Sequence, residues 1–270
     1  MDHHDTKESP FIGSRANVLM LHGHGQSGRT FQIKTRFLLK PLREAISGAL
    51  SGVNDQLLPP GNIEFFYPDG TLPAQIPETH EHIISESEPK EDDEILDQWT
   101  WAYGDHRGEK IIGFEESIQY VLDLLHKHGP FIGIIGFSTG AALAAITASL
   151  LEQDRRVRNS CFEVRHPPLH FAVCYSGFKL SHKKYRSLYY PKIETPILHY
   201  IGTLDSWISE SQTLKLAKRC RYVKIAYFMG THFVPRSRGM LEILVHFVTE
   251  SCGGREDESI ESLESDWVDI

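Results

Sequence analysis

The chain has 270 residues, of which 40% are hydrophobic and 10% aromatic, and its formal net charge is −8 at pH 7. This length and apolar content suit one globular α/β domain with a full core. No apolar run approaches the roughly 18 residues of a membrane-spanning helix, the polar N-terminus lacks the apolar stretch of a signal peptide, and no basic stripe is interleaved with aromatics. A transmembrane protein, a secreted protein and a nucleic-acid-binding protein are therefore not expected.

The negative charge is concentrated in two segments. Residues 78–97 hold nine acidic residues and residues 255–270 hold seven, each segment with a single basic residue. Outside them the chain is mildly basic, so the acidity does not create a field around a central site. We expect one domain over residues 1–254, with a loop-rich, lid-like insert over 72–110, and an acidic, disordered tail over 255–270.

The four cysteines, Cys161, Cys174, Cys220 and Cys252, form no C-x-x-C pair. In a chain of this size such spacing is typical of free thiols in a reducing compartment. We therefore expect a cytoplasmic protein.

Strands and helices are expected to alternate along the chain. Short apolar runs bounded by turn residues predict strands over 16–21, 62–67, 131–135, 171–176, 196–201 and 222–228. Apolar spacing and alanine content predict helices over 30–49, over 113–128, directly after residue 138, and over 239–250. This alternation predicts an α/β fold with a mostly parallel central sheet and helices on both faces.

The most informative motif lies where the strand over 131–135 meets the alanine-rich helix. Gly136-Phe137-Ser138-Thr139-Gly140 is a G-x-S-x-G sequence in the strand–turn–helix context of a nucleophile elbow. The turn would place Ser138 in a strained conformation, and a Cβ on Gly136 or Gly140 would collide with a neighbouring strand or helix. The free N–H groups of the following helix would point at the reaction centre. The alternative is a glycine-rich turn without a catalytic role.

A serine nucleophile needs a base, and the base needs an orienting carboxylate. In hydrolases with this elbow, the acid and then the histidine follow the serine along the chain. Asp205 follows the strand over 196–201 and His232 follows the strand over 222–228, so both are expected at the edge of the sheet that carries the elbow. Asp205 alone would also suit a turn. The competing histidines suit core, helix or loop positions: His166, His170, His199 and His246.

An oxyanion hole needs two backbone N–H donors. The expected donors are the amide of Thr139, directly after the nucleophile, and the amide of His24, in the loop after the first strand. The side chain of His22, in the same loop, is expected to brace that loop.

Several aromatic side chains are candidates for the substrate site. Trp99, Trp101 and Tyr103 alternate along a strand-like stretch, so they would share one side and either line an apolar acyl pocket or pack in the core. Phe178, after the strand over 171–176, and Trp207, close to Asp205, are further candidates for the pocket wall. No H-E-x-x-H, C-x-x-C or phosphate-loop motif is present, so neither a metal nor a cofactor is expected.

Together these motifs resemble the fungal serine hydrolase family, which includes the ovarian-tumour-associated hydrolase-like esterases. The resemblance covers most of residues 16–250. Its specific segments are Leu21-His22-Gly23, Gly113-Phe114-Glu115-Glu116-Ser117, Gly129-Pro130-Phe131, the elbow, Tyr175-Ser176-Gly177-Phe178, Asp205 and His232-Phe233-Val234-Pro235. The resemblance implies an α/β-hydrolase fold, a Ser138–Asp205–His232 triad, and esterase or thioesterase activity on acyl substrates.

Three positions depart from the family pattern. Thr139 stands where the family often has Gln, Thr231 stands where it often has Gly, and bulky Trp207 stands where small β-branched residues are usual. None of these removes a catalytic group, and all three bear on the choice of substrate.

The expected protein is a cofactor-free serine hydrolase that cleaves the ester or thioester of an apolar acyl chain through an acyl-enzyme. Because several fungal members of the family release or trim polyketide chains, the resemblance also implies a polyketide-pathway thioesterase. Its substrate would then be either a small-molecule ester or thioester or an acyl chain bound to a carrier protein. Two alternatives stay open: an acyltransferase on the same fold, and a non-catalytic hydrolase-like binding protein.

Overall fold

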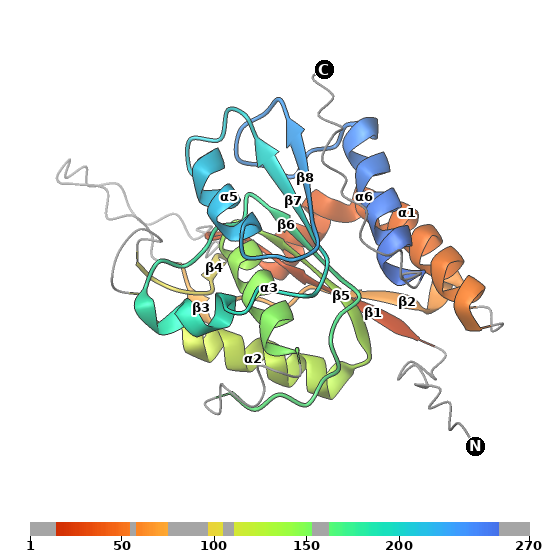
Figure 1. The fold of residues 1–270 in the computed structure, drawn as a ribbon, viewed down its shortest axis with the longest axis horizontal. Coiled ribbons are helices and arrows are strands. Elements are labelled where there is room, and N and C mark those ends of the chain that lie inside the picture. The colour runs from red at the N-terminus through yellow and green to blue at the C-terminus, as the bar shows by residue number, and fades with distance from the viewer. Residues whose placement is uncertain (1–14, 55–57, 75–96, 105–110, 153–161, 254–270) are drawn as a thin grey trace, which may run out of the picture.

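The computed structural model describes residues 15–54, 58–74, 97–104, 111–152 and 162–253 (Figure 1). Most of the predicted insert, the whole predicted tail and Cys161 lie outside these residues, so the predictions made for them stay predictions.

A six-stranded parallel sheet forms the centre of the fold, with the strand order β2-β1-β5-β6-β7-β8 (Figure 1). The strands are β1 (Ala16–Leu21), β2 (Ile63–Phe66), β5 (Phe131–Phe137), β6 (Phe171–Tyr175), β7 (Ile197–Gly202) and β8 (Val223–Phe228). Phe137 lies opposite Tyr175, and Gly202 lies opposite Phe228, so the carboxyl ends of these strands share one edge. The predicted parallel α/β architecture is confirmed.

Helices cover both faces of this sheet (Figure 1). One face carries α1 (Gly28–Asn54) and α6 (Arg238–Cys252), and the other carries α2 (Phe114–His128), α3 (Thr139–Leu150) and α5 (Glu210–Ala217). Because successive side chains of a strand point to opposite faces, Val18 and Met20 join the core under α1 and α6, whereas Leu19 and Leu21 join the core under α2 and α3.

Helix α3 occupies the most enclosed position, since every residue from Gly140 to Leu150 is buried. Its alanines lose no side-chain entropy on folding and let the helix backbone lie close to the sheet. The buried helix therefore holds the residue that precedes it, Ser138, in a fixed place.

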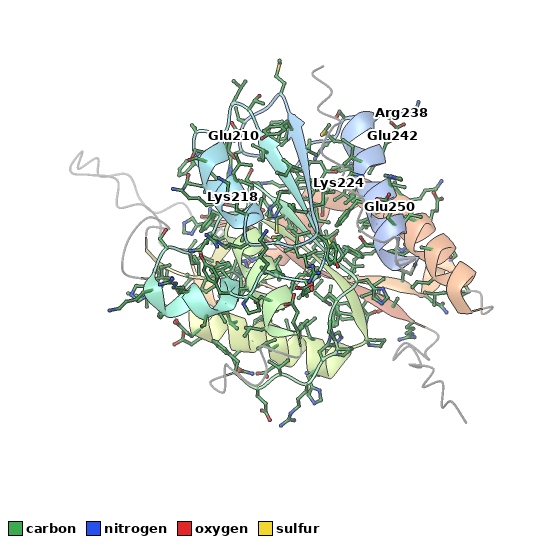
Figure 2. All side chains as sticks on the ribbon, in the orientation of Figure 1. Glu210, Lys218, Lys224, Arg238, Glu242 and Glu250 are labelled. Atoms are coloured by element: carbon green, nitrogen blue, oxygen red, sulfur yellow. The ribbon has the colours of Figure 1, made fainter. Side chains whose placement is uncertain are left out.

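Strand β8, at one edge of the sheet, carries Lys224, which is labelled in Figure 2 together with Glu250 of α6 and Glu210 of α5. Lys224 lies 3.7 Å from a carboxylate oxygen of Glu250 on α6, and the Tyr227 hydroxyl donates to Glu210 on α5 at 2.7 Å. These contacts hold the strand that leads into the His232 loop.

Some elements differ from the prediction. Helix α1 extends past the predicted 30–49 at both ends, and α5 and the 3₁₀ helix η2 (Lys183–Tyr189) are additional. The short α5 buries only Thr213, Leu216 and Ala217, which gives too few apolar positions for a helical pattern. The strand-like stretch around Trp99 contributes only β4 (Trp99–Thr100), which pairs antiparallel with β3 (Leu72–Pro73). In the described part of the chain, no helix combines the length and apolarity needed to cross a bilayer.

Candidate active site

The elbow between β5 and α3 has the strained geometry that its sequence predicts. Ser138 has φ 54° and ψ −116°, a conformation that costs a residue with a Cβ about 1–3 kcal/mol. Its backbone N–H donates to the Tyr175 carbonyl at 2.9 Å. A Cβ on Gly136 would lie 2.3 Å from the Gly140 carbonyl oxygen, and a Cβ on Gly140 would lie 2.3 Å from the His22 carbonyl oxygen. Both glycines are therefore required by direct backbone packing.

Asp205 lies after β7 with its carboxylate enclosed, the side chain being 1% exposed. Oδ1 accepts from the backbone N–H groups of Trp207 and Ile208, both at 2.9 Å. Oδ2 accepts from the Ser176 hydroxyl at 2.8 Å and lies 2.7 Å from Nδ1 of His232. Burial alone would raise the pKa of Asp205, but the hydrogen bonds from His232, Ile208 and Ser176 outweigh it and hold the pKa below the ordinary value. Asp205 is therefore an ionised acceptor at neutral pH.

His232 lies in the loop after β8, with its side chain 18% exposed. Because Nδ1 faces a carboxylate, Nδ1 carries the proton and Nε2 has the free lone pair that a general base uses. The imidazole packs against the ring of Phe137, at 4.7 Å between centroids, and Phe137 directly precedes Ser138. The structure therefore brings Asp205 and His232 together beside the elbow.

Two backbone hydrogen bonds join the loops that carry Asp205 and His232. The Thr203 N–H donates to the Phe228 carbonyl at 3.0 Å, and the Leu204 N–H donates to the Gly230 carbonyl at 2.9 Å. The two loops therefore form one connected unit at the carboxyl ends of β7 and β8.

A model of the serine hydrolase (FSH1) family matches residues 13–243 of this chain. The chain belongs to this family of serine hydrolases. A Schizosaccharomyces pombe protein named dihydrofolate reductase is 28% identical over 231 residues, which cover 81% of this chain and 44% of that protein. Esterase OVCA2 of Danio rerio is 29% identical over 230 residues, which cover 81% of this chain and 89% of that protein.

The chain spans about half the length of two S. pombe relatives that it matches. Among solved structures, acyl-protein thioesterase 2 of Zea mays aligns with a TM-score of 0.56 at 16% identity, over 91% of this chain and 97% of that one. At this identity the likeness concerns the fold alone, and it confirms the α/β-hydrolase architecture.

In this serine hydrolase the loop after β1 runs directly beside Ser138 of the elbow. A Cβ on Gly23 would lie 3.4 Å from Cβ of Ser138. His22 is fully buried, its Nε2 accepts from the Gly70 N–H at 2.9 Å, and its Nδ1 lies 2.7 Å from the Gly23 carbonyl oxygen. An acceptor at Nε2 requires the proton at Nδ1, and burial lowers the pKa of His22, so the ring is neutral. His22 braces this loop, and the Nδ1 of its neighbour His24 bonds Thr100 Oγ1 at 2.9 Å.

The predicted pocket aromatics lie in different environments. Trp101 is fully buried and its indole N–H donates to the His22 carbonyl at 2.8 Å, which supports the core-packing alternative for this residue. Phe178 is 3% exposed and belongs to the core cluster under α2 and α3. Trp99 and Tyr103 are half-buried beside β3, and Tyr103 donates to the Pro73 carbonyl. Trp101 and Phe178 thus pack in the core, and the pocket role of the other three aromatics stays a prediction.

Trp207 is the predicted aromatic that lies exposed beside His232. It is 72% exposed, and its ring centroid is 6.5 Å from that of His232. Three more apolar side chains on the same two loops are exposed, and sequence reasoning does not single them out: Leu204 at 61%, Met229 at 90% and Phe233 at 44%. The sequence feature that could have identified them is their position, because each lies within four residues of Asp205 or His232.

The competing histidines have other roles. His199 is fully buried in β7, and burial lowers its pKa to about 3. His166 is buried, and its Nε2 accepts from the Phe131 N–H at 2.9 Å. His246 pairs with Glu250 one turn later on α6, beside an open apolar groove of about 450 Å³ that includes none of the predicted site residues.

Ser176 is a site residue that sequence reasoning does not assign. It follows β6, is 2% exposed, and has a positive φ of 50°. In the sequence Ser176 ends the predicted strand over 171–176 and precedes Gly177, so it is expected at the same edge of the sheet as Asp205, and this position is the signal that would have identified it.

Proposed function

We propose that this protein hydrolyses esters or thioesters through an acyl-enzyme on Ser138. His232 takes the hydroxyl proton at Nε2 and later delivers it to the leaving group. Asp205 keeps the imidazole in the tautomer that allows this and stabilises the imidazolium. Water then attacks the acyl-enzyme and releases the acid. The observation that carries the proposal is the short Asp205–His232 contact directly beside the strained serine.

The same geometry supports the oxyanion hole that the sequence predicts. Thr139 is the first residue of α3, so its amide is one of the free N–H groups at the helix N-terminus. The loop with Gly23 and His24 passes the nucleophile closely enough for a second backbone donor. We propose that the amides of Thr139 and His24 stabilise the oxyanion.

A Ser138→Ala variant tests the proposal. It should fold, fail to hydrolyse a p-nitrophenyl ester, and fail to react covalently with a fluorophosphonate probe. Ser149→Ala is a matched control, because it removes the hydroxyl of a buried serine near the opposite end of α3. If the wild type neither turns over esters nor reacts with the probe, the non-catalytic binding protein is the correct alternative.

We also propose that the acyl chain is apolar. The exposed loop residues Leu204, Trp207, Met229 and Phe233 support this, because they place apolar surface around His232. The name of the Danio rerio relative, an esterase, is consistent with ester hydrolysis. An acyltransferase would use the same acyl-enzyme, and the ratio of acid to transfer product in the presence of an added alcohol or amine distinguishes the two reactions.

A carrier-bound chain, as in a polyketide pathway, is a further proposal, and a group of basic residues supports it. The guanidinium groups of Arg186 and Arg219 lie 5.7 and 4.4 Å from the ring centroid of Tyr190. Burial first, and then Arg219, Arg186 and Lys215, lower the pKa of Lys179. Within the residues that the structure describes, none of these four cations forms an ion pair with an acid, whereas Lys184 pairs with Glu115.

A charge reversal tests the carrier. Arg186→Glu combined with Lys215→Glu should raise KM for an acyl-carrier thioester and leave KM for the matching N-acetylcysteamine thioester unchanged. An equal effect on both substrates would show that the basic group does not recognise a carrier.

Hydrolysis should proceed without a metal. In the described ranges no three His, Cys, Asp or Glu side chains gather as metal ligands would. The proposed steps use only the serine hydroxyl, the imidazole, the carboxylate and water, so activity should survive dialysis against EDTA. A loss that a divalent ion restores would contradict the proposal. Cys174, Cys220 and Cys252 are free thiols, which supports the proposed cytoplasmic location.

A further inference from the structure

Two serines share an unusual backbone conformation at adjacent strand ends. In the described part of the chain, Ser138 and Ser176 are the non-glycine residues with positive φ, at 54° and 50°. Ser138 follows β5 and Ser176 follows β6, its neighbour in the sheet. Each donates its backbone N–H to the next strand, Ser138 to the Tyr175 carbonyl at 2.9 Å and Ser176 to the Tyr200 carbonyl at 3.0 Å. Such conformations are unfavourable for residues with a Cβ and gather at functional sites.

The backbone turn directs the Ser176 hydroxyl at the acid of the proposed triad. Its Oγ donates to Oδ2 of Asp205 at 2.8 Å, and the same oxygen lies 2.7 Å from Nδ1 of His232. Ser176 is 2% exposed and the Asp205 side chain 1% exposed. A hydrogen bond to an ionised group in such an enclosed place is strong, because little water competes with it.

The backbone alone does not account for a serine at this position. Glycine adopts positive φ readily and would lack the strain that serine incurs here. Ser176 also helps to fix Oδ2 of Asp205, since the backbone donors Trp207 and Ile208 hold only Oδ1. The other partner of Oδ2 is Nδ1 of His232, the group that Oδ2 has to face. The hydroxyl is therefore the part of Ser176 that the site uses.

We propose that Ser176 is a positioning residue of the hydrolase, whose hydroxyl holds the Asp205 carboxylate with Oδ2 facing Nδ1 of His232. The proposal rests on the proposed function, because it assigns Asp205 and His232 to catalysis. Ser176 acts through these two groups and not on the substrate.

Ser176→Gly is the decisive variant, because it removes the hydroxyl and suits the backbone. Its melting temperature should stay close to that of the wild type, because relief of the backbone strain offsets the lost hydrogen bond. Its kcat should fall roughly 10- to 100-fold, as for the loss of one hydrogen bond to a charged group. KM should stay within about threefold, since no substrate contact is removed. Ser176→Ala should lose as much kcat and, in addition, have a lower melting temperature than Ser176→Gly.

The pH profile provides a readout that a purely structural role would not change. The hydrogen bond from Ser176 helps to lower the pKa of Asp205, so its loss raises that pKa. The acidic limb of the kcat/KM profile reports the protonation of the coupled Asp205–His232 pair, and a carboxylate that has lost one donor binds protons within this pair more tightly. The limb should therefore move to higher pH in Ser176→Gly and Ser176→Ala. Ser149→Ala, which removes a buried hydroxyl that bonds the Leu188 carbonyl, should lower the melting temperature without moving this limb.

A spectroscopic measurement separates this inference from the proposed function. The low-field proton resonance of His232 Nδ1–H should shift in both Ser176 variants and stay in place in Ser149→Ala, whether or not a substrate has been found. Unchanged resonance, kcat and acidic limb in a folded Ser176→Gly would overturn the positioning role. A wild-type protein that fails to react with fluorophosphonate would instead overturn the proposed function.

Discussion

The proposed nucleophile and the proposed acid–base pair of this serine hydrolase are held in different ways. Ser138 is fixed by backbone packing, because Gly136 and Gly140 bring β5, α3 and the loop after β1 into direct contact. Asp205 and His232 are held by a small number of hydrogen bonds between two loops that expose large apolar side chains. The first arrangement tolerates no added atom, whereas the second depends on single donors and acceptors.

This difference indicates how each half should respond to mutation. Substitutions at the elbow glycines should act on the fold, and substitutions in the two loops should act on catalysis. The following four predictions test this contrast, beginning with the largest expected effect.

Removal of the base or the acid should abolish most of the activity. His232→Ala should lower kcat by about 10⁶-fold, because the members of the proposed triad act as a unit. Asp205→Asn should lower it by about 10⁴-fold, because the imidazole then favours the wrong tautomer. Steady-state hydrolysis of a p-nitrophenyl ester measures both. If Asp205→Asn were fully active, another carboxylate would have to be the acid of the triad. Asp69, which accepts from the Gly28 N–H, would be tested next.

An added methyl group at the elbow should unfold the protein more readily. The Cβ of Gly140→Ala would lie 2.3 Å and 2.4 Å from the carbonyl oxygens of His22 and Leu21, so the free energy of unfolding should fall by at least about 3 kcal/mol. Gly48→Ala is the control, because nothing lies within 4 Å of its Cβ on α1, and it should stabilise by about 0.5–1 kcal/mol. Urea denaturation measures both, and equal stabilities would contradict the packing argument.

Trp207 should set the preference for longer acyl chains. Each buried CH₂ contributes about 0.8 kcal/mol, so kcat/KM should rise along a series of C2 to C12 esters until the apolar surface is covered. Trp207→Ala should lower kcat/KM for the esters of medium chain length by about tenfold, which flattens this rise. Tyr222→Ala, an exposed aromatic at the opposite end of β8, should leave the series unchanged. A strict preference for acetyl in the wild type would show that the proposed apolar substrate class is wrong.

The Asp205 interactions should also make a small contribution to stability that depends on pH. The pKa of Asp205 is lowered from 3.8 in the folded protein, so its stabilising effect is present above that value and is lost as the pH falls below it. In a series of thermal melts from about pH 6 down to about pH 3, the melting temperature should therefore decline less steeply for Asp205→Asn than for the wild type. If the melting temperatures of the two proteins declined equally with falling pH, this contribution would be excluded.

The sequence is informative where structure is local. Gly136, Ser138 and Gly140 specify the elbow because its constraints act within five residues. Asp205 and His232 were predictable from chain order and strand ends, although their mutual contact depends on strand register. Their catalytic assignment stays a proposal.

Other features depend on contacts between distant segments. Trp101 is buried because its indole reaches the His22 carbonyl, a partner that periodicity does not reveal. The Ser176 contact with Asp205 likewise joins two strand ends 29 residues apart. Such pairings become visible only when the order of strands in the sheet is known.

The bonds between Thr203 and Phe228 and between Leu204 and Gly230 have a consequence for protein engineering. They make the segments after β7 and β8 a single exchangeable module. A chimera that receives only one of the two segments from a relative would separate the acid from the base. Substrate range should therefore be transferred between relatives by exchanging residues 203–235 together, with the elbow of the recipient left intact.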